Sequence, residues 1–362
     1  MSDNIPFELQ EGIIKRVLPV KSLIRFRSVS KQWKSLIDSP EFIADHIVNP
    51  AQPQHLLVKY IVDSKEKYVS ISDNDDSLPH HNSSLIVPPT IIDKIFSILD
   101  CSHGLVCLYG DFRGPVRRRS KMTVLWNPSI RKSVGIVMPY EFVVIGFGVC
   151  PKTSDPKIVA IKSGNRIDSK AVVFTLSSGA WRSITVNLRW PLNSMHLSCK
   201  PVVIDGVIHW IAFDNLPRWI ISFDLTSEEF GEVELPDSLA HATNLSISNF
   251  KGSLSVLIYK EAAVVCDVWT MIKTGDPMTR FTTVSFKRES DRIIRFMKNS
   301  QMIREHTCMR PGNFPVTTLE VYDSYSEHSN YLRVSGFFDP HIMKTSYTES
   351  LLLLNHSVSV IL

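Results

Sequence analysis

A short segment recurs along most of this chain at intervals of roughly 50 residues. Each copy is an apolar run that ends in an aromatic residue and is followed by a polar residue and a turn. The aromatic positions are Trp126, Phe174, Phe223, Trp269 and Tyr322, and their spacings are 48, 49, 46 and 53. A period of this length, with four strands per repeat, is typical of the blade of a kelch-like β-propeller. The alternative is a generic all-β domain in which the spacing is a coincidence, since the paired glycines of kelch repeats are absent.

Strand-like runs fill the chain after about residue 54, and turn residues separate them. The clearest runs are Leu56–Val62, Val143–Val149, Ile158–Ile161, Val202–Ile204, Val207–Ile211 and Leu254–Tyr259. Asp205-Gly206 joins two of these runs and suits a two-residue hairpin turn, because both residue types tolerate positive φ. At the observed period, the 313 residues after position 49 predict about six blades.

The first 48 residues have a helical pattern instead. Leu9, Ile13 and Val17 recur every four residues, which places them on one helical face. A further apolar stripe begins at Val29, and Ser39-Pro40-Glu41 has the composition of a helix start. We expect three short helices here, with a core so small that the unit depends on a partner. The predicted organisation is an all-α unit at 1–48, a linker at 49–54 and an all-β domain at 55–362.

Composition excludes several classes of protein. The apolar fraction of 44% and the charged fraction of 21% are those of an ordinary soluble globular chain. A net charge of +4 is too small to indicate a nucleic acid or a membrane as partner. The charged N-terminus leaves no room for a secretory signal, and the six cysteines show no zinc-binding spacing. We therefore expect reduced thiols and a cytoplasmic or nuclear protein.

Residues 5–47 resemble the F-box of plant F-box proteins. The matching positions are Ile5, Pro6, Glu8, Leu9, Ile13, Ile14, Arg16, Leu18, Pro19, Val20, Lys21, Ser22, Leu23, Arg25, Phe26, Arg27, Val29 and Trp33. The sequence departs from the family pattern in three places: Ile5 replaces Leu, Ser30 replaces a common Cys, and one extra residue stands near Val17. That extra residue leaves open whether Leu9 and Pro19 stay in register for adaptor binding.

The resemblance implies that the N-terminal unit binds a Skp-type adaptor and, through it, a Cullin–RING assembly. The residues that it assigns to this contact are Ile5, Pro6, Leu9, Leu18, Pro19, Val20, Leu23, Phe26 and Trp33. Periodicity alone favours a purely structural role for the helical apolar residues, whereas the resemblance favours contact for the turns that contain proline. Trp33 is expected to serve in both roles.

Residues 96–355 resemble the F-box-associated domain of the same plant proteins. The landmarks are Cys101–Leu108, Leu125–Ile130, Gly146–Gly148, Phe174–Ile184, Asp205–Trp210, Phe223–Pro236 and Tyr347–Leu351. The resemblance implies a domain that captures a protein substrate for an SCF-type (Skp–Cullin–F-box) ubiquitin ligase and catalyses nothing itself. Two alternatives stay open, namely an F-box protein that acts outside the ligase and an enzyme built on a propeller.

Several other motifs are better explained as structure than as sites. Arg117-Arg118-Arg119 favours a solvated loop, and the Asp73–Asp76 stretch lacks the glycine and glutamate of a calcium loop. Gly146-Phe147-Gly148 has no third glycine, so dinucleotide binding is rejected. The pair His80-His81 and the group Cys101, His103 and Cys107 are more readily structural than metal-binding. The chain is therefore predicted to use no cofactor and no metal.

Overall fold

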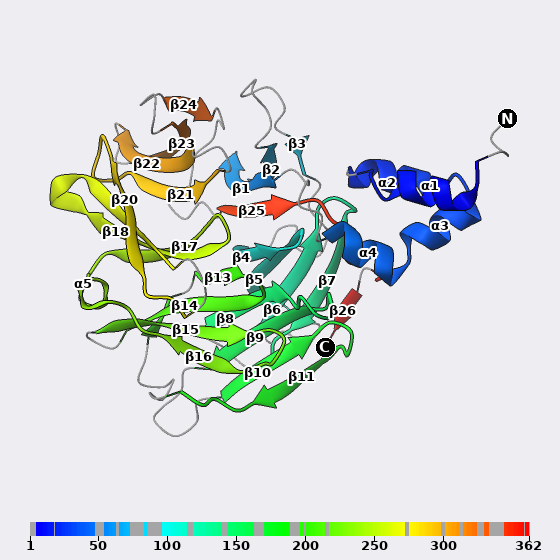
Figure 1. Ribbon diagram of the computed structural model, residues 1–362, viewed down its shortest axis with the longest axis horizontal. Helices are drawn as coiled ribbons and strands as arrows, with labels where there is room; N and C mark the ends of the chain where they lie inside the picture. The colour runs from blue at the N-terminus through cyan, green and yellow to red at the C-terminus, as the bar shows by residue number, and fades with distance from the viewer. Residues whose placement is uncertain are drawn as a thin grey trace.

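The computed structural model describes an N-terminal helical unit beside a larger β-domain (Figure 1). The described residues are 5–17, 19–47, 54–62, 65–72, 83–85, 96–113, 119–139, 144–162, 170–188, 196–198, 200–213, 217–271, 275–297, 301–310, 314–323, 329–332, 344–357 and 359–361. The predicted sites at 73–76 and 80–81, the first two residues of the Arg117–Arg119 motif and residues 49–53 of the predicted linker at 49–54 lie outside them. Gln54 and Arg119 are each the first residue of a strand.

The helical unit has four helices in the described residues, where the sequence predicted three. They are α1 (Phe7–Ile14), α2 (Val20–Phe26), α3 (Lys31–Ile37) and α4 (Pro40–Ile47). Serine caps explain why the later part divides into two helices. Ser30 Oγ accepts the Trp33 N–H at 3.1 Å, and Ser39 Oγ accepts the Phe42 N–H at 3.2 Å. A side-chain cap satisfies a first-turn donor, so it favours a new helix start.

The β-domain is a six-bladed propeller, because the described strands form six sheets of four or five strands each. Blade 1 contains β25 (Lys344–Thr348), β1 (Gln54–Val62), β2 (Lys65–Ser72) and β3 (Ser83–Ser84). Blade 2 contains β4 (Phe96–Ser102), β5 (Leu105–Arg113), β6 (Arg119–Asn127), β7 (Lys132–Val137) and β26 (Ser359–Ile361). Blade 3 contains β8 (Val144–Val149), β9 (Pro156–Lys162), β10 (Lys170–Thr175) and β11 (Ala180–Ile184).

The remaining blades follow in chain order. Blade 4 contains β12 (His196–Leu197), β13 (Val202–Ile204), β14 (Val207–Phe213), β15 (Arg218–Asp224) and β16 (Phe230–Val233), with α5 (Asp237–Ala240) after it. Blade 5 contains β17 (Leu245–Phe250), β18 (Ser253–Lys260), the short 3₁₀ helix η2 (Glu261–Ala263), β19 (Val265–Thr270) and β20 (Thr279–Ser285). Blade 6 contains β21 (Arg292–Phe296), β22 (Met302–Arg310), β23 (Phe314–Tyr322) and β24 (Ser329–Leu332).

The aromatic repeat marks the same place in every blade. Trp126, Phe174, Phe223, Trp269 and Tyr322 lie on β6, β10, β15, β19 and β23, each of which is the third strand of its blade path. The repeat and the expected number of blades are thus confirmed. Blade 1 has an equivalent that the sequence did not reveal: Tyr68, on β2, is buried and meets Trp126 edge-on, with ring centroids 5.3 Å apart.

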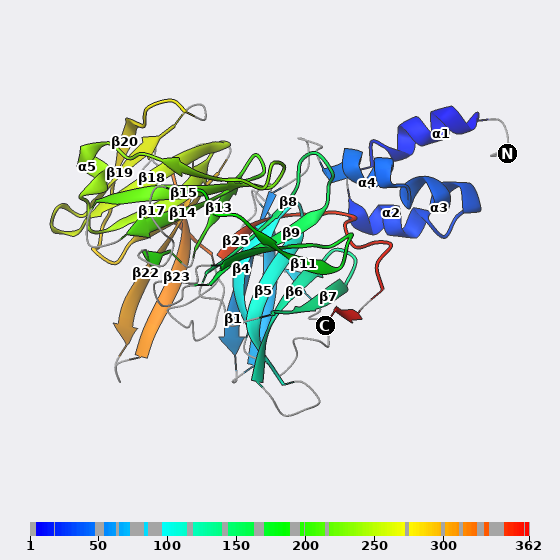
Figure 2. The same ribbon diagram turned by 90° about the horizontal axis from the view of Figure 1, so that it is seen from below.

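The ring closes because blade 1 takes its first strand from the far end of the chain. β25 pairs antiparallel with β1, with Leu57 opposite Thr345, and also lies beside β4 of blade 2. Gly104 makes the close approach possible there. Its φ is +78°, and a Cβ at this position would lie 2.5 Å from the Thr348 carbonyl oxygen. Figure 2 shows β25 crossing between the blades toward the helical unit.

Glycine also explains the motif that resembled a truncated dinucleotide loop. Gly146 lies on the first strand of blade 3, where a Cβ would fall 2.3 Å from the ring of Trp210 in blade 4. Gly148 is crowded in the same way by Leu225. Both glycines therefore allow neighbouring blades to pack closely. The predicted Asp205-Gly206 hairpin is also confirmed, since both residues have positive φ, 47° and 78°.

Candidate functional site

The helical unit presents exposed apolar side chains along α1. Ile5, Leu9 and Ile13 follow one another every four residues and are 50%, 61% and 59% exposed. Val29, between α2 and α3, is 63% exposed. Exposed apolar side chains of this kind are candidates for contact with a partner. The predicted contact set omitted Ile13 and Val29, although the four-residue spacing after Leu9 indicated Ile13.

Other predicted contact residues divide between surface and core. Pro6 and Pro19 are exposed, as a contact role requires. Val20 and Leu23 are both 0% exposed and pack within this chain, and their contact with an adaptor stays a prediction. Leu18 lies outside the described residues.

Phe26 and Trp33 combine packing with partial exposure. Their rings meet edge-on, with centroids 5.4 Å apart and an interplanar angle of 66°. Trp33 Nε1 donates a hydrogen bond to Gln10 Oε1 at 2.9 Å, which links α3 to α1. Both residues are half-buried, so Trp33 orders the helices, and its contact with an adaptor stays a prediction.

The cluster that buries Val20 and Leu23 includes residues from the other end of the chain. Leu351 and Leu354 are buried in one cluster with Val20, Leu23 and Ile37. The segment that carries these leucines directly follows β25, the strand that closes the propeller. The helical unit and the β-domain therefore share an apolar core, which the sequence pattern did not predict.

Polar contacts hold the same segment against two helix ends. Glu349 Oε2 accepts the backbone N–H of Val20 at 3.0 Å, at the start of α2. Asn355 Nδ2 donates to the backbone carbonyl of Asp38 at 2.9 Å, at the end of α3. Groups at helix ends lack partners within the helix, so these two contacts satisfy backbone atoms that would otherwise need water.

Two polar side chains of blade 2 donate hydrogen bonds to the backbone of the same segment. Asn127 is fully buried, and its Nδ2 donates to the carbonyls of Ser350 and Leu352 at 2.9 and 2.7 Å. Lys132 Nζ donates to the carbonyls of Leu354 and His356 at 2.5 and 2.7 Å. Burial, assisted by the nearby charge of Arg27, lowers the pKa of Lys132. The turn from β6 to β7 thus fixes the position of the segment that holds the helices.

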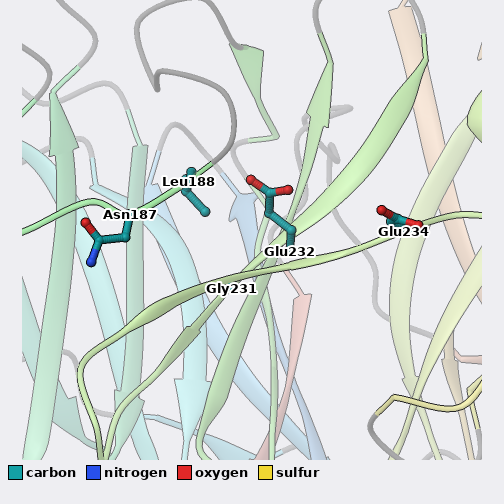
Figure 3. Close-up of a pocket in the computed structure, with 5 residues that line it drawn as sticks. All are labelled: Asn187, Leu188, Gly231, Glu232 and Glu234. Carbon is teal, nitrogen blue, oxygen red and sulfur yellow. The ribbon is translucent and has the colours of Figure 1, made fainter.

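A pocket on the β-domain, between blades 3 and 4, has a volume of about 470 Å³. Figure 3 shows its lining residues, which are Asn187, Leu188, Gly231, Glu232 and Glu234. Leu188 comes from the segment that leaves blade 3, whereas Glu232 lies on β16, the last strand of the blade 4 path. The pocket is therefore an open recess between blades.

Sequence comparison assigns both parts of this molecule to known families. Residues 3–45 match the F-box domain, and residues 55–352, which make up most of the chain, match the F-box associated beta propeller domain. The chain belongs to the F-box proteins that carry this propeller. Its helical unit is thus an F-box.

Similar proteins from Arabidopsis thaliana agree with this assignment. The F-box/kelch-repeat protein At3g23880 is 28% identical over 75% of this chain and 77% of its own length. The putative F-box protein At1g47730 is 26% identical over 75% of this chain and 69% of its own length. The F-box protein At5g18160 is 29% identical over 76% of this chain and 68% of its own length. Together with the two matched domains, these relatives support a role in substrate recognition.

Solved structures resemble this F-box protein only loosely. In a structural study of two prolyl endopeptidases, the matching chain is 8% identical, with a TM-score of 0.44 over 85% of this chain and 54% of the other. A likeness at that level carries no conclusion about activity.

The cysteines and histidines singled out in the sequence do not form a metal-binding cluster in the described part of this F-box protein. Burial, followed by the charge of Asp100, raises the pKa of the Cys101 and Cys107 thiols well above their ordinary value. His103 occupies a tight turn with φ of 49°, and its Nδ1 lies 2.9 Å from Ser102 Oγ. Among the helices that the structure describes, none is long and apolar enough to span a bilayer.

Proposed function

We propose that this F-box protein is the substrate-recognition subunit of an SCF-type ubiquitin ligase. Its F-box binds a Skp-type adaptor and, through it, a Cullin–RING assembly, while the kelch-like propeller captures a protein target. The observation that carries the proposal is the exposed stripe of Ile5, Leu9 and Ile13 on a helical unit whose buried core includes Leu351 and Leu354 of the C-terminal segment. An apolar stripe of this size favours a protein partner over continuous exposure to water.

The shared core gives the proposed function a physical basis. A ligase receptor works by proximity: it holds the target where the charged conjugating enzyme can reach its lysines. Glu349, Leu351, Leu354 and Asn355 tie the F-box to the propeller, so a target held by one is held at a defined position relative to the other. No residue of this chain needs to touch the thioester. The proposed compartment is the cytoplasm, the nucleus or both.

Affinity purification tests the proposal directly. The intact chain is expected to capture a Skp-type adaptor together with a Cullin, and Leu9→Ser with Ile13→Ser is expected to lose both proteins. An adaptor captured without a Cullin would favour the second candidate, an F-box protein that acts outside the ligase. Unchanged capture of both proteins by the double variant would contradict the proposed interface.

A further inference from the structure

Four consecutive leucines, Leu351–Leu354, divide their buried side chains between the two domains. Leu351 and Leu354 belong to the F-box cluster, to which α1, α2, α3 and α4 each contribute at least one buried residue. Leu352 and Leu353 belong to the cluster that blades 2 and 3 share. The leucine run is therefore part of two hydrophobic cores at once, and its release from either core would expose apolar surface to water.

The backbone of the run turns sharply enough to make this division possible. The Leu354 N–H donates to the Leu351 carbonyl at 3.0 Å. Leu353 has a φ of +68°, in the left-handed region that a bulky residue rarely occupies. Such a conformation costs free energy and persists only where the surrounding structure holds it. The hydrogen bonds that Asn127 and Lys132 donate to this segment supply that support.

Helix α2 depends on the same segment for the cap of its first turn. Pro19 occupies the N-cap position of α2, and no hydrogen bond from a capping side chain is present there. Glu349 supplies an acceptor from the C-terminal segment, where it accepts the Val20 N–H. A carboxylate at this end of a helix is also favoured by the helix dipole. By contrast, α3 is capped within the F-box by Ser30.

Closure of the propeller holds the segment in place. β25 ends at Thr348, directly before Glu349, and pairs with β1 of blade 1. Tyr347 of β25 is buried in the cluster between blades 1 and 2, and its hydroxyl contacts Ser129. Consecutive residues lie only about 3.8 Å apart along the chain. If β25 leaves the ring, Glu349 and the leucines after it therefore move as well.

We propose that the segment Glu349–Asn355 makes the F-box conditional on closure of the propeller. In the closed ring the segment completes the F-box core and caps α2, and in an open ring the F-box loses both supports. Ile14 of α1 packs in the same cluster, so the exposed stripe of Leu9 and Ile13 keeps its position only while that cluster is intact. The F-box thus presents its adaptor face only on a chain whose propeller is closed. This consequence for the adaptor rests on the proposed function, whereas the dependence of the F-box on ring closure does not.

Hydrogen exchange of the full chain, resolved to single amides by mass spectrometry, tests the proposal at a temperature where every variant is folded. Tyr347→Ala removes a closing contact but no atom of the F-box cluster. Phe223→Ala, in the core between blades 3 and 4, is the matched control. Because amides exchange through local opening, Tyr347→Ala is expected to speed exchange in α2 and α3 at least about tenfold and Phe223→Ala less than about twofold. Equal rates in the two variants would overturn the proposal.

A second pair of variants addresses the cap and removes no buried side chain. Val20 lies in the first turn of α2, where a backbone N–H has no partner within the helix, so the protection of this amide depends on Glu349. Glu349→Ala is expected to abolish that protection, and Glu349→Gln, which keeps an acceptor oxygen, is expected to retain most of it. Equal protection in Glu349→Ala and in the parent chain would overturn the role of the segment.

A bound adaptor gives a reciprocal test, because the coupling between two sites acts in both directions. A Skp-type adaptor is expected to slow exchange at the paired amides of β1 and β25 and to leave those of blade 4 unchanged. An adaptor that binds without slowing exchange in β25 would overturn the coupling. An adaptor that does not bind would contradict the proposed function, and the variants without adaptor would still decide whether ring closure controls the F-box.

Discussion

Glu349 Oε2 accepts the backbone N–H of Val20 at 3.0 Å, across 329 positions of the sequence. This hydrogen bond joins the start of α2 to the segment that closes the propeller, and Leu351 and Leu354 pack beside it. The F-box is thus more than an appended domain, because part of its core belongs to the C-terminal segment. Changes at that segment are therefore expected to affect both domains.

Replacing Leu354 with Ala removes a fully packed side chain from the shared core. The expected loss in the free energy of unfolding is about 2–5 kcal/mol, and chemical denaturation of the intact chain measures it. Val360→Ala, on the more exposed β26, is the control and is expected to cost less than 1 kcal/mol, roughly the range of surface changes. Similar losses for the two variants would contradict the shared core.

Removing residues 1–48 uncovers Leu351 and Leu354, because the F-box residues of their cluster are then gone. The truncated chain is expected to keep its six blades but to melt at a lower temperature than the intact chain. The double variant Leu351→Ser with Leu354→Ser is expected to harm the intact chain and to benefit the truncated one. The pair should destabilise the intact chain and improve the solubility of the truncated one, since exposed apolar patches promote association. Equal effects in both backgrounds would exclude the contact.

Leu9 and Ile13 are expected to contribute to adaptor binding without contributing to the stability of the fold, because both are more than half exposed. Leu9→Ala with Ile13→Ala should weaken binding of a Skp-type adaptor at least about tenfold, which is the effect of losing interface anchors. Titration calorimetry measures the affinity, and the unfolding temperature should stay unchanged. Leu23→Ala is the contrasting variant, since its side chain is fully buried and its loss should lower the unfolding temperature.

Two tryptophans of neighbouring blades, Trp126 and Trp181, are expected to contribute differently to the free energy of unfolding. Trp126 is fully buried and packs against Tyr68, whereas Trp181 is half-buried and donates from Nε1 to the carbonyl of Val137 at 3.2 Å. Trp126→Ala is expected to cost about 3–5 kcal/mol, and Trp181→Ala less. Denaturation of the two variants under the same conditions gives the comparison. A larger loss for Trp181 would show that the outer strand of blade 3 contributes more to stability than its exposure indicates.

His209 predicts a dependence of stability on pH. Burial lowers its pKa below the ordinary 6.5, so as pH falls the unfolded chain takes up a proton before the folded one does. The free energy of unfolding should therefore decrease as pH falls below about 6.5 and stop changing, for this residue, below the folded pKa. His209→Gln is expected to flatten that slope between about pH 7 and 5, as measured by denaturation at each pH. An unchanged slope would mean that His209 does not titrate in this range.

The local pattern of the sequence determined the repeating unit. An aromatic residue before a polar turn marks the third strand of a blade. The sequence can show this because the alternation of apolar and polar residues and the choice of turn residues both involve only a few neighbouring positions. The same local rules predicted the Asp205-Gly206 hairpin and placed Leu9 and Ile13 on one helical face. Periodicity favoured a structural role for that face, whereas the structure leaves both side chains exposed. The local rules also predicted the helix start at Ser39-Pro40-Glu41, where Ser39 caps α4, but the prediction was three helices and the described residues contain four.

Only the tertiary structure decided which residues meet across long sequence distances. The cluster that buries Val20 and Leu23 takes in Leu351 and Leu354 from the other end of the chain. Blade 1 is complete only when β25 returns to it. Such pairings depend on how blades stack and how the ring closes, and no periodicity within a single strand or helix encodes them.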